Sequence, residues 1–301
     1  MGLGKFPSGS GGASGSAGDR SDASNHTNHP DHSNHPDHPN RPNQLARQPA
    51  NDISAILNSW EYEPGTINVR KITGADGRPK LQMRLDLGLL QMEIQGRPDG
   101  KRPNGFESLI EYFEDSLKQH EERNGTDLGF HLTPPQCAAI REEAVMYYNR
   151  YLSLFVLGEY AGVARDTARN LHVLDFCGKY AIDEHDQLIL EQYRPYIIMM
   201  NARALASIEK ENGNYAIALD LVRQGLQDIR QFFIRFKQPE AFKQSNEVQI
   251  LQRFAREIRQ HLPPDPLRQL KRELQKALKD ERYEEAAKLR DEIEKLEHTE
   301  S

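Results

Sequence analysis

Five histidines near the start of the chain are spaced strictly three residues apart. They lie in the segment NHTNHPDHSNHPDHPNRP, at His26, His29, His32, His35 and His38. A polyproline II conformation repeats every three residues, so it would bring the five imidazoles to one side, where they would chelate Zn²⁺, Ni²⁺ or Cu²⁺ loosely. We favour the simpler interpretation of a low-complexity tract. Residues 1–50 contain almost no Ile, Val or Leu, and we predict that they form a disordered arm.

A second group of titratable residues is Asp183-Glu184-His185-Asp186. Carboxylates beside an imidazole would suit a hydrolase or a metal site. The group stands where a helix is expected to begin, however, and acidic residues there stabilise the helix dipole, so capping is the favoured role. Cys137 and Cys177 lack the spacing of metal ligands and are expected to be small buried residues. The sequence therefore predicts no catalytic residue, no metal and no cofactor.

Basic and aromatic residues are mixed in the segment from Arg230 to Lys237, and residues 223–261 carry eight Lys and Arg against four Asp and Glu. Such a mixture would bind a nucleic-acid single strand by stacking and charge. The spacing of Phe232, Phe233 and Phe236 is helical, however, and more typical of a core. Nucleic acid is therefore not expected to be the primary partner.

Composition narrows the function classes further. The chain has 301 residues, with 39 Lys and Arg against 45 Asp and Glu, a net charge of -6 that argues against duplex DNA as the main partner. Two cysteines exclude a disulfide scaffold and a four-cysteine zinc site. No apolar run approaches the roughly 18–20 residues of a membrane span, and the Gly/Ser-rich start lacks the apolar core of a signal peptide. We expect a cytoplasmic protein that does not contact membranes.

Residues 51–130 are predicted to form a small α+β module. Ile67 and Val69 alternate with polar residues, and a second strand places Leu81, Met83, Leu85 and Leu87 on one buried face. The alternation changes phase after Gly88, which indicates a bulge or a corner between two strands. Apolar residues at helical spacing then predict a helix from Phe106 to about Gly125.

Residues 131–262 are predicted to form a helical bundle. Thr133-Pro134-Pro135-Gln136 has the pattern of a capping box, and Pro195 must kink or break the helix expected over residues 184–212. The stretch from Asn201 to Gly225 places small residues, Ala206 and Ala218, where two helices would cross, with Tyr215 over the turn between them. It resembles one tetratricopeptide unit. A generic helical bundle remains the alternative, because a weaker echo near Tyr160 lies 55 residues away and not 34.

Residues 265–298 carry the most specific pattern in the chain. Their apolar residues step by three and four in two halves separated by Asp280-Glu281-Arg282, which predicts an antiparallel helical hairpin. The first half has Leu267, Leu270, Leu274 and Ala277, and the second has Tyr283, Ala286, Leu289, Ile293 and Leu296. The fold class is thus mainly α, with a disordered arm, a small α+β module, a tetratricopeptide-like bundle and this C-terminal hairpin.

The hairpin resembles the UVR motif found in UvrB and UvrC. The run Ala286-Ala287-Lys288-Leu289-Arg290-Asp291 carries the specific part of the resemblance. In that family the hairpin is a docking element that pairs with a UVR hairpin of another protein. No G-x-x-x-x-G-K-[ST] loop accompanies it here, so the motor of UvrB is not encoded in this sequence.

The resemblance implies a protein-binding surface on the hairpin. We expect the edges of Leu270, Leu274, Leu289 and Ile293 to stay partly exposed and to dock on a second copy or on another UVR-containing protein, with Arg290 and Asp291 setting the geometry. The sequence thus favours a non-enzymatic interaction or adaptor protein. Two alternatives remain: an accessory factor of an excision-repair-like complex with weak nucleic-acid contact, and an enzyme of unrecognised class.

Overall fold

The computed structural model describes residues 52–262 and 266–299, so the arm predicted over residues 1–50 lies outside the described part. The chain divides into two compact units, Met1–Glu61 and Tyr62–Ser301. Within the first unit, the described residues form one short helix, α1 (Ser54–Asn58). The carboxylate of Asp52 accepts a hydrogen bond of 2.9 Å from the backbone N–H of Ser54, which forms an Asx turn just before the helix, whereas the N-cap position itself is Ile53.

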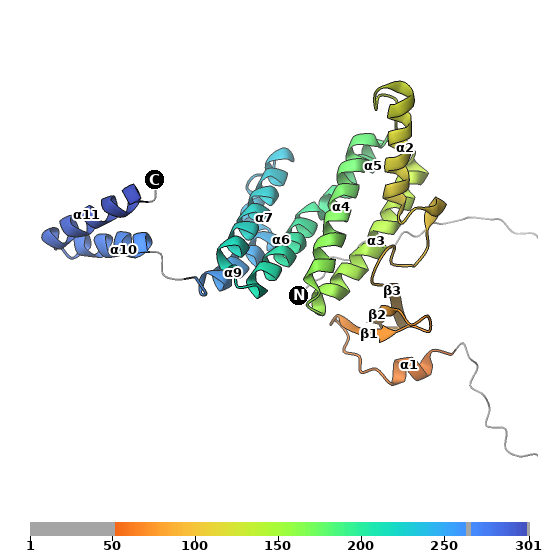
Figure 1. Cartoon of the computed structure of the whole chain (residues 1–301), viewed down its shortest axis with the longest axis horizontal. Helices are drawn as coiled ribbons and strands as arrows, with labels where there is room; N and C mark the ends of the chain where they lie inside the picture. Colours follow the sequence, from red (N-terminus) through yellow and green to blue (C-terminus); the bar gives the residue numbers. More distant parts are fainter. Residues whose placement is uncertain (1–51, 263–265, 300–301) are drawn as a thin grey trace, which may run out of the picture. The chain divides into compact units, whose positions relative to one another are not determined.

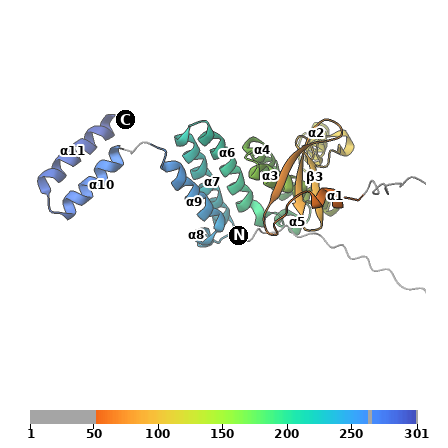
Figure 2. The same cartoon turned by 90° about the horizontal axis from the view of Figure 1, so that it is seen from below.

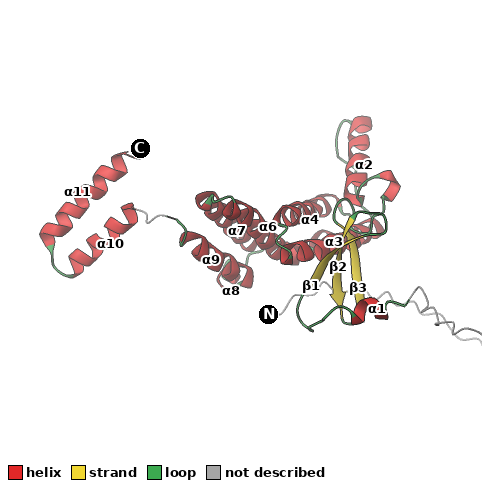
Figure 3. Cartoon of the chain, turned by 60° about the horizontal axis from the view of Figure 1, so that its bottom comes forward, coloured by secondary structure: helices red, strands yellow, loops and turns green. Residues whose placement is uncertain are grey.

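The second unit begins with a three-stranded antiparallel sheet in the order β1-β2-β3 (Figure 3). The strands are β1 (Asn68–Thr73), β2 (Pro79–Leu85) and β3 (Gly88–Glu93). Leu81 in the central strand pairs with Lys71 on one side and Met92 on the other, and it is fully buried. Leu81 and Met83 are buried, as the sequence predicted, but Leu85 is 41% exposed, and Gln82 between the two buried residues is itself 5% exposed.

The phase change at Gly88 marks a tight hairpin and not a bulge. Leu85 pairs directly with Gly88, which leaves Asp86 and Leu87 as a two-residue turn between β2 and β3. The expected burial of Leu87 is wrong: its side chain is 94% exposed. A strand's alternation ends where the chain reverses, so Leu87 continues the apolar pattern in the sequence without belonging to the buried face.

The next segment leads from the sheet to the helices. A 3₁₀ turn (Pro103–Gly105) precedes α2 (Leu109–Asn124), which begins three residues after the predicted Phe106. Ser108 caps α2 by accepting from the backbone N–H of Glu111 at 3.4 Å. Gly125 ends the helix in the left-handed region, at φ 73°, where glycine is favoured.

Helices make up the rest of the described bundle, and Figure 1 shows the longer ones running side by side. They are α3 (Pro134–Val156), α4 (Tyr160–Tyr180), α5 (Glu184–Leu188), a 3₁₀ turn (Glu191–Tyr193), α6 (Arg194–Glu211), α7 (Tyr215–Arg235), α8 (Ala241–Gln244) and α9 (Asn246–Arg259). Helix α4 packs on α3, α6 packs on α4, α7 packs on α6, and α9 packs on α7.

Local signals explain where these helices start and stop. The Gln136 side chain accepts from the backbone N–H of Thr133 at 2.8 Å, which confirms the capping interaction at α3. The helix expected over residues 184–212 is broken, and Pro195 lies in the first turn of α6, where its missing N–H costs nothing. Helices α8 and α9 are separated at Ser245, which ends α8 and caps α9 by accepting from the N–H of Val248 at 3.3 Å.

Small residues allow α6 and α7 to approach closely. Ala206 and Ala218 are fully buried, and a Cβ atom added to Gly225 would lie 2.5 Å from the Cβ of Ala202. Tyr215 does not simply cover the turn: its ring stacks on His261, with centroids 4.9 Å apart. The α6–α7 hairpin is therefore real, and its likeness to a tetratricopeptide unit remains a prediction.

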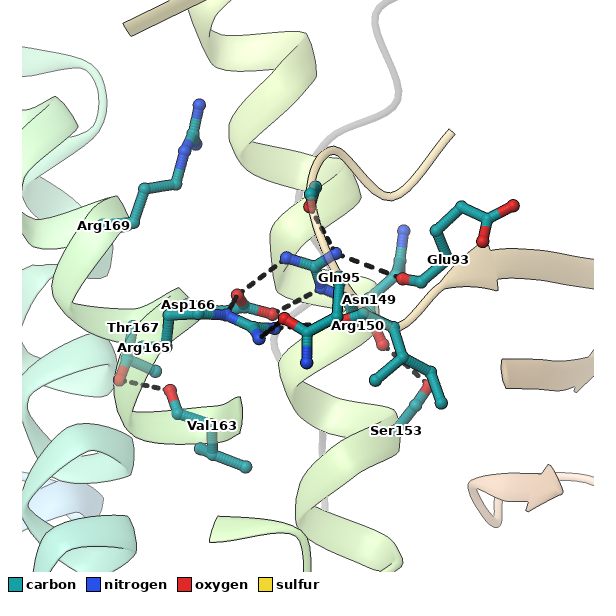
Figure 4. Close-up of polar contacts among 12 residues, drawn as sticks. Glu93, Gln95, Asn149, Arg150, Ser153, Val163, Arg165, Asp166, Thr167 and Arg169 are labelled. Carbon is teal, nitrogen blue, oxygen red and sulfur yellow. Dashed lines mark hydrogen bonds and ion pairs between the residues drawn. The ribbon is translucent and has the colours of Figure 1, made fainter. Parts of the chain in front are cut away.

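A buried ion pair anchors the end of the sheet to the bundle (Figure 4). Arg150 of α3 and Asp166 of α4 are both 1% exposed. The Arg150 guanidinium also donates to the backbone carbonyls of Glu93 at 3.1 Å and Gly96 at 2.6 Å. One side chain thus joins two helices and the strand end of β3, and Asp166 supplies the charge that compensates it.

A second buried carboxylate, Glu143, lies about two helical turns before Arg150 on α3. It is fully buried, pairs with Arg169, and approaches the Nε of Arg97 at 3.4 Å. It also accepts from the backbone N–H of Leu109 at 3.0 Å, which satisfies a free donor at the start of α2. Arg97 is therefore engaged internally, and the loop of residues 96–105 serves as a fixed connector.

Within the described residues, no helix is both long enough and apolar enough to cross a membrane.

Candidate protein-interaction site

The C-terminal hairpin consists of α10 (Pro266–Lys279) and α11 (Tyr283–Thr299), which pack on each other (Figure 2). The turn closes with a 2.8 Å hydrogen bond from the N–H of Arg282 to the carbonyl of Ala277. Glu281 stands in the left-handed region, at φ 57°, within that turn. The predicted antiparallel hairpin is confirmed, and its turn falls at the predicted Asp280-Glu281-Arg282.

The seam between α10 and α11 is built from small and branched apolar side chains. Ala277 and Ala286 are buried, at 0% and 5% exposed, and let the two helices approach closely. Leu289 packs against them, with Leu270 and Leu274 at the margin. The seam therefore uses most of the apolar stripe that the sequence showed on each helix.

The predicted protein-binding residues divide into three groups by exposure. Buried in the hairpin are Ala277, Ala286, Leu289 and Ile293; half-buried are Leu270 and Leu274; exposed are Tyr283, Ala287, Arg290 and Asp291. The side chain of Leu296 lies outside the described part. Leu289 and Ile293 were expected to keep partly exposed edges, and this expectation is wrong: they are 9% and 7% exposed. This part of the α11 stripe is turned toward α10, whereas Tyr283 at the start of the stripe is exposed.

The exposed apolar surface of the hairpin lies beside its turn. Leu278 is 50% exposed and Tyr283 is 67% exposed, on the two sides of the turn. Sequence reasoning missed Leu278, although its place four residues after Leu274 puts it one helical turn further along the same side of α10. An exposed tyrosine beside an exposed leucine presents a large apolar area with one hydrogen-bonding group.

These residues share one side of the hairpin. With about 100° between successive residues, Leu274 and Leu278 lie on one flank of the α10 stripe. In the antiparallel partner, Tyr283 and Ala287 lie on the flank that faces the same way. We define the tip face as Leu274, Leu278, Tyr283 and Ala287. Among the hairpin residues whose side chains the structure describes, it holds the most exposed large apolar side chains, Leu278 and Tyr283.

The hairpin is also electrically polarised. Helix α10 has five Lys and Arg and one Glu, a net charge of +4, whereas α11 has six Asp and Glu and three Lys and Arg, a net charge of -3. In the turn, Arg282 pairs with Glu285 at 2.5 Å and with Asp280 at 3.2 Å. A second hairpin laid alongside with the helices exchanged would place opposite charges together.

Comparison with known families identifies this segment. Residues 265–299 match the UvrB/uvrC motif. The UVR motif is a helical hairpin known to mediate protein–protein interaction, and the match agrees with the closed seam and the exposed tip face described above. Neither the curated proteins nor the solved structures contain a match to the chain. The match identifies residues 265–299 as a UVR motif, and the bundle must be interpreted from its own structure.

The cluster from Asp183 to Asp186 acts in folding. Asp183 caps α5 by accepting from the N–H of His185 at 2.8 Å, as the sequence favoured. Asp186 is buried and pairs with Arg141 of α3. Within the described part of the chain, no group of three or more His, Cys, Asp and Glu residues could hold a metal ion.

Both cysteines are free and buried, as expected. Burial raises the pKa of the Cys137 thiol and raises that of Cys177 to about 12. A raised pKa keeps a thiol protonated, and the thiolate is the nucleophile and the metal ligand. Their environment therefore favours a packing role.

The basic and aromatic segment at the end of α7 is partly engaged within the bundle. Phe232 and Phe236 are half-buried and pack on each other, with ring centroids 4.7 Å apart. The guanidinium of Arg235 pairs with Glu191 at 2.6 Å. A groove of about 460 Å³ lies beside Phe236, and Arg194 and Glu191, which form an ion pair at 2.6 Å, line its wall together with Arg235. Arg235 and the rings of Phe232 and Phe236 are therefore engaged within the bundle.

Proposed function

We propose that this chain is a non-enzymatic adaptor whose C-terminal hairpin docks a partner protein through the tip face. The observation that carries the proposal is the exposure of Leu278 and Tyr283 on a hairpin whose seam is already closed. Burying the exposed parts of these two side chains would contribute about 1–2 kcal/mol each to binding, before the cost of association. The UVR match supports an interaction role for this segment.

The preferred partner is another UVR hairpin, either in a second copy of this chain or in a different protein. The opposite charges of α10 and α11 support this choice, because each helix would meet its electrostatic complement in a second hairpin of the same kind. Arg290 and Asp291 are exposed beside the seam and would orient the partner. They would add little affinity, since exposed ion pairs are worth about 0–1 kcal/mol.

The test compares two full-length double variants. Leu278→Asp with Tyr283→Asp places two charges in the tip face. Gln269→Asp with Lys288→Gln makes the same change in net charge at exposed positions outside the tip face. Self-association is measured by sedimentation equilibrium, and partner recovery by affinity capture with quantitative mass spectrometry.

We expect the tip-face variant to lose self-association or the captured partner, while the control variant behaves like wild type. Circular dichroism should show that both variants retain their helices, because the substituted side chains lie outside the seam. Unchanged association of the tip-face variant would contradict the proposal. Equal loss in both variants would also contradict it, since that result would reflect net charge alone.

A further inference from the structure

One side of α9 carries arginines and glutamines and no acidic residue. The exposed side chains on this side are Gln249, Gln252, Arg253, Arg256, Arg259 and Gln260, which we call the arginine face. Buried residues occupy the opposite side, where Leu251, Ala255 and Ile258 pack on the bundle. At about 100° per residue, the arginine face covers roughly a third of the helix surface.

The acidic residues of α9 lie outside this face. Glu247 accepts from the hydroxyl of Ser245 at 2.7 Å, at the start of the helix. Glu257 acts electrostatically on Arg203 of α6, on the other flank of α9. In the part of the chain that the structure describes, no ion pair joins Arg253, Arg256 or Arg259 to an acidic residue.

Two other exposed cations of the bundle are neutralised by acidic residues nearby. Arg223 pairs with Asp220 at 2.6 Å, and Lys243 pairs with Glu240 at 3.3 Å, each within one helical turn. The three arginines of α9 therefore form a local positive surface in a chain whose net charge is -6. Guanidinium groups bind carboxylates and phosphates through two parallel hydrogen bonds, and glutamine amides beside them add further donors.

Two polyanionic partners fit such a surface, and the structure favours one of them. Single-stranded nucleic acid needs aromatic side chains for base stacking, and the arginine face has none. Duplex DNA needs an extended basic surface, which the net charge of -6 opposes. An acidic helix presents carboxylates three and four residues apart, and this spacing matches arginines placed every three residues along α9.

We propose that the arginine face binds an acidic helix of a partner protein. This surface is separate from the tip face, so the chain has two docking elements, one in the bundle and one in the hairpin. Helix α9 packs on α6, α7 and α8, and these contacts leave the arginine face uncovered. Binding is dominated by charge-assisted hydrogen bonds and therefore weakens as salt rises.

The test uses the full chain and a defined probe. The probe is a fluorescent Ala-based helical peptide with Glu at every third or fourth position, and its matched control has Gln at the same positions. Binding is followed by fluorescence anisotropy at 0.05 and 0.15 M salt. One variant carries Arg253→Gln, Arg256→Gln and Arg259→Gln. The matched variant carries Lys118→Gln, Arg223→Gln and Lys243→Gln, which removes the same charge from ion-paired positions.

We expect the Glu peptide to bind wild type and the matched variant within twofold of each other. The arginine-face variant should bind at least tenfold more weakly, and the Gln peptide should not bind. Exposed Arg→Gln changes preserve helix propensity, so all proteins should keep the same melting temperature. Equal weakening in the two variants would overturn the proposal, as would tighter binding of a 20-base-pair DNA duplex than of the Glu peptide. The tip-face variant should bind the Glu peptide like wild type, which separates this proposal from the hairpin function.

Discussion

Arg150 of α3 and Asp166 of α4 form a buried ion pair with two parallel hydrogen bonds, at 2.7 Å from Nε and 2.8 Å from a terminal nitrogen. The remaining guanidinium donor points to the backbone at the end of β3, where it reaches the carbonyls of Glu93 and Gly96. Asp166 also accepts from Arg165 at 2.9 Å. The pair therefore links α3 and α4 to the chain at the end of β3.

Removing one partner of this pair should strongly destabilise the bundle. Arg150→Met leaves the Asp166 carboxylate buried and incompletely paired, and such a change costs about 3–5 kcal/mol. The matched control is Arg223→Met, which breaks an exposed pair of a kind worth about 0–1 kcal/mol. Urea unfolding followed by circular dichroism measures both free energies of unfolding. Similar losses of unfolding free energy in the two variants would show that the buried pair stabilises the bundle no more than an exposed pair does.

Replacing two helical glycines with alanine should change the stability of the bundle in opposite directions. Gly225→Ala introduces a Cβ atom 2.5 Å from that of Ala202, so the helices must separate, and we expect a loss of about 1–3 kcal/mol. Gly178→Ala in α4 meets its nearest atom only at 4.0 Å. This second change should stabilise by roughly 0.5–1 kcal/mol, because alanine favours a helix more than glycine. Thermal melting of the two variants would test the difference in sign.

The buried cysteines predict slow thiol chemistry and a loss of stability at high pH. The pKa of Cys177 is raised to about 12 in the folded chain, whereas an exposed thiol titrates near 8.5. Below about pH 8.5 the thiol is protonated in both the folded and the unfolded chain, and its full contribution to the free energy of unfolding is present. That contribution is lost as the pH rises from about 9 toward 12, because the unfolded chain loses its thiol proton first. Reaction with a disulfide reagent at pH 8 should be slow in the native protein and fast in urea. Rapid native labelling would contradict the burial.

Sequence patterns predicted the helical elements well where local signals decide the outcome. The capping box at Thr133, the break before Pro195 and the hairpin turn at Asp280 all rest on backbone requirements of a few adjacent residues. Leu87 shows where such reasoning fails, because alternation alone does not reveal that the strand has already ended.

The candidate sites were less accessible to sequence reasoning, because exposure depends on how two stripes meet. On α11, Leu289 and Tyr283 belong to the same apolar pattern, yet the first is buried in the seam and the second is not. The missing information was the rotation of α11 about its axis. The arginine face of α9 is similar, since an excess of basic residues was visible in the sequence but their pairing was not.

The seam of the hairpin gives the last prediction, which separates folding of the UVR segment from its docking. Ile293 is 7% exposed, so Ile293→Asp would bury a charge in the seam. The described hairpin spans residues 266–299, fewer than the roughly 40 residues that usually suffice for independent folding, so it has little stability to lose. We expect Ile293→Asp to unfold α10 and α11 and to abolish docking.

The bundle should be unaffected, since α10 and α11 pack mainly on each other. The Ile293→Asp variant should therefore lose helical circular dichroism equivalent to the hairpin while the main melting transition keeps its midpoint. Tyr283→Asp should abolish docking with no loss of helical signal, because its side chain is 67% exposed. If Tyr283→Asp also unfolds the hairpin, the tip face is part of the fold and not a docking surface. If Ile293→Asp lowers the melting temperature of the bundle, the hairpin and the bundle are one cooperative unit.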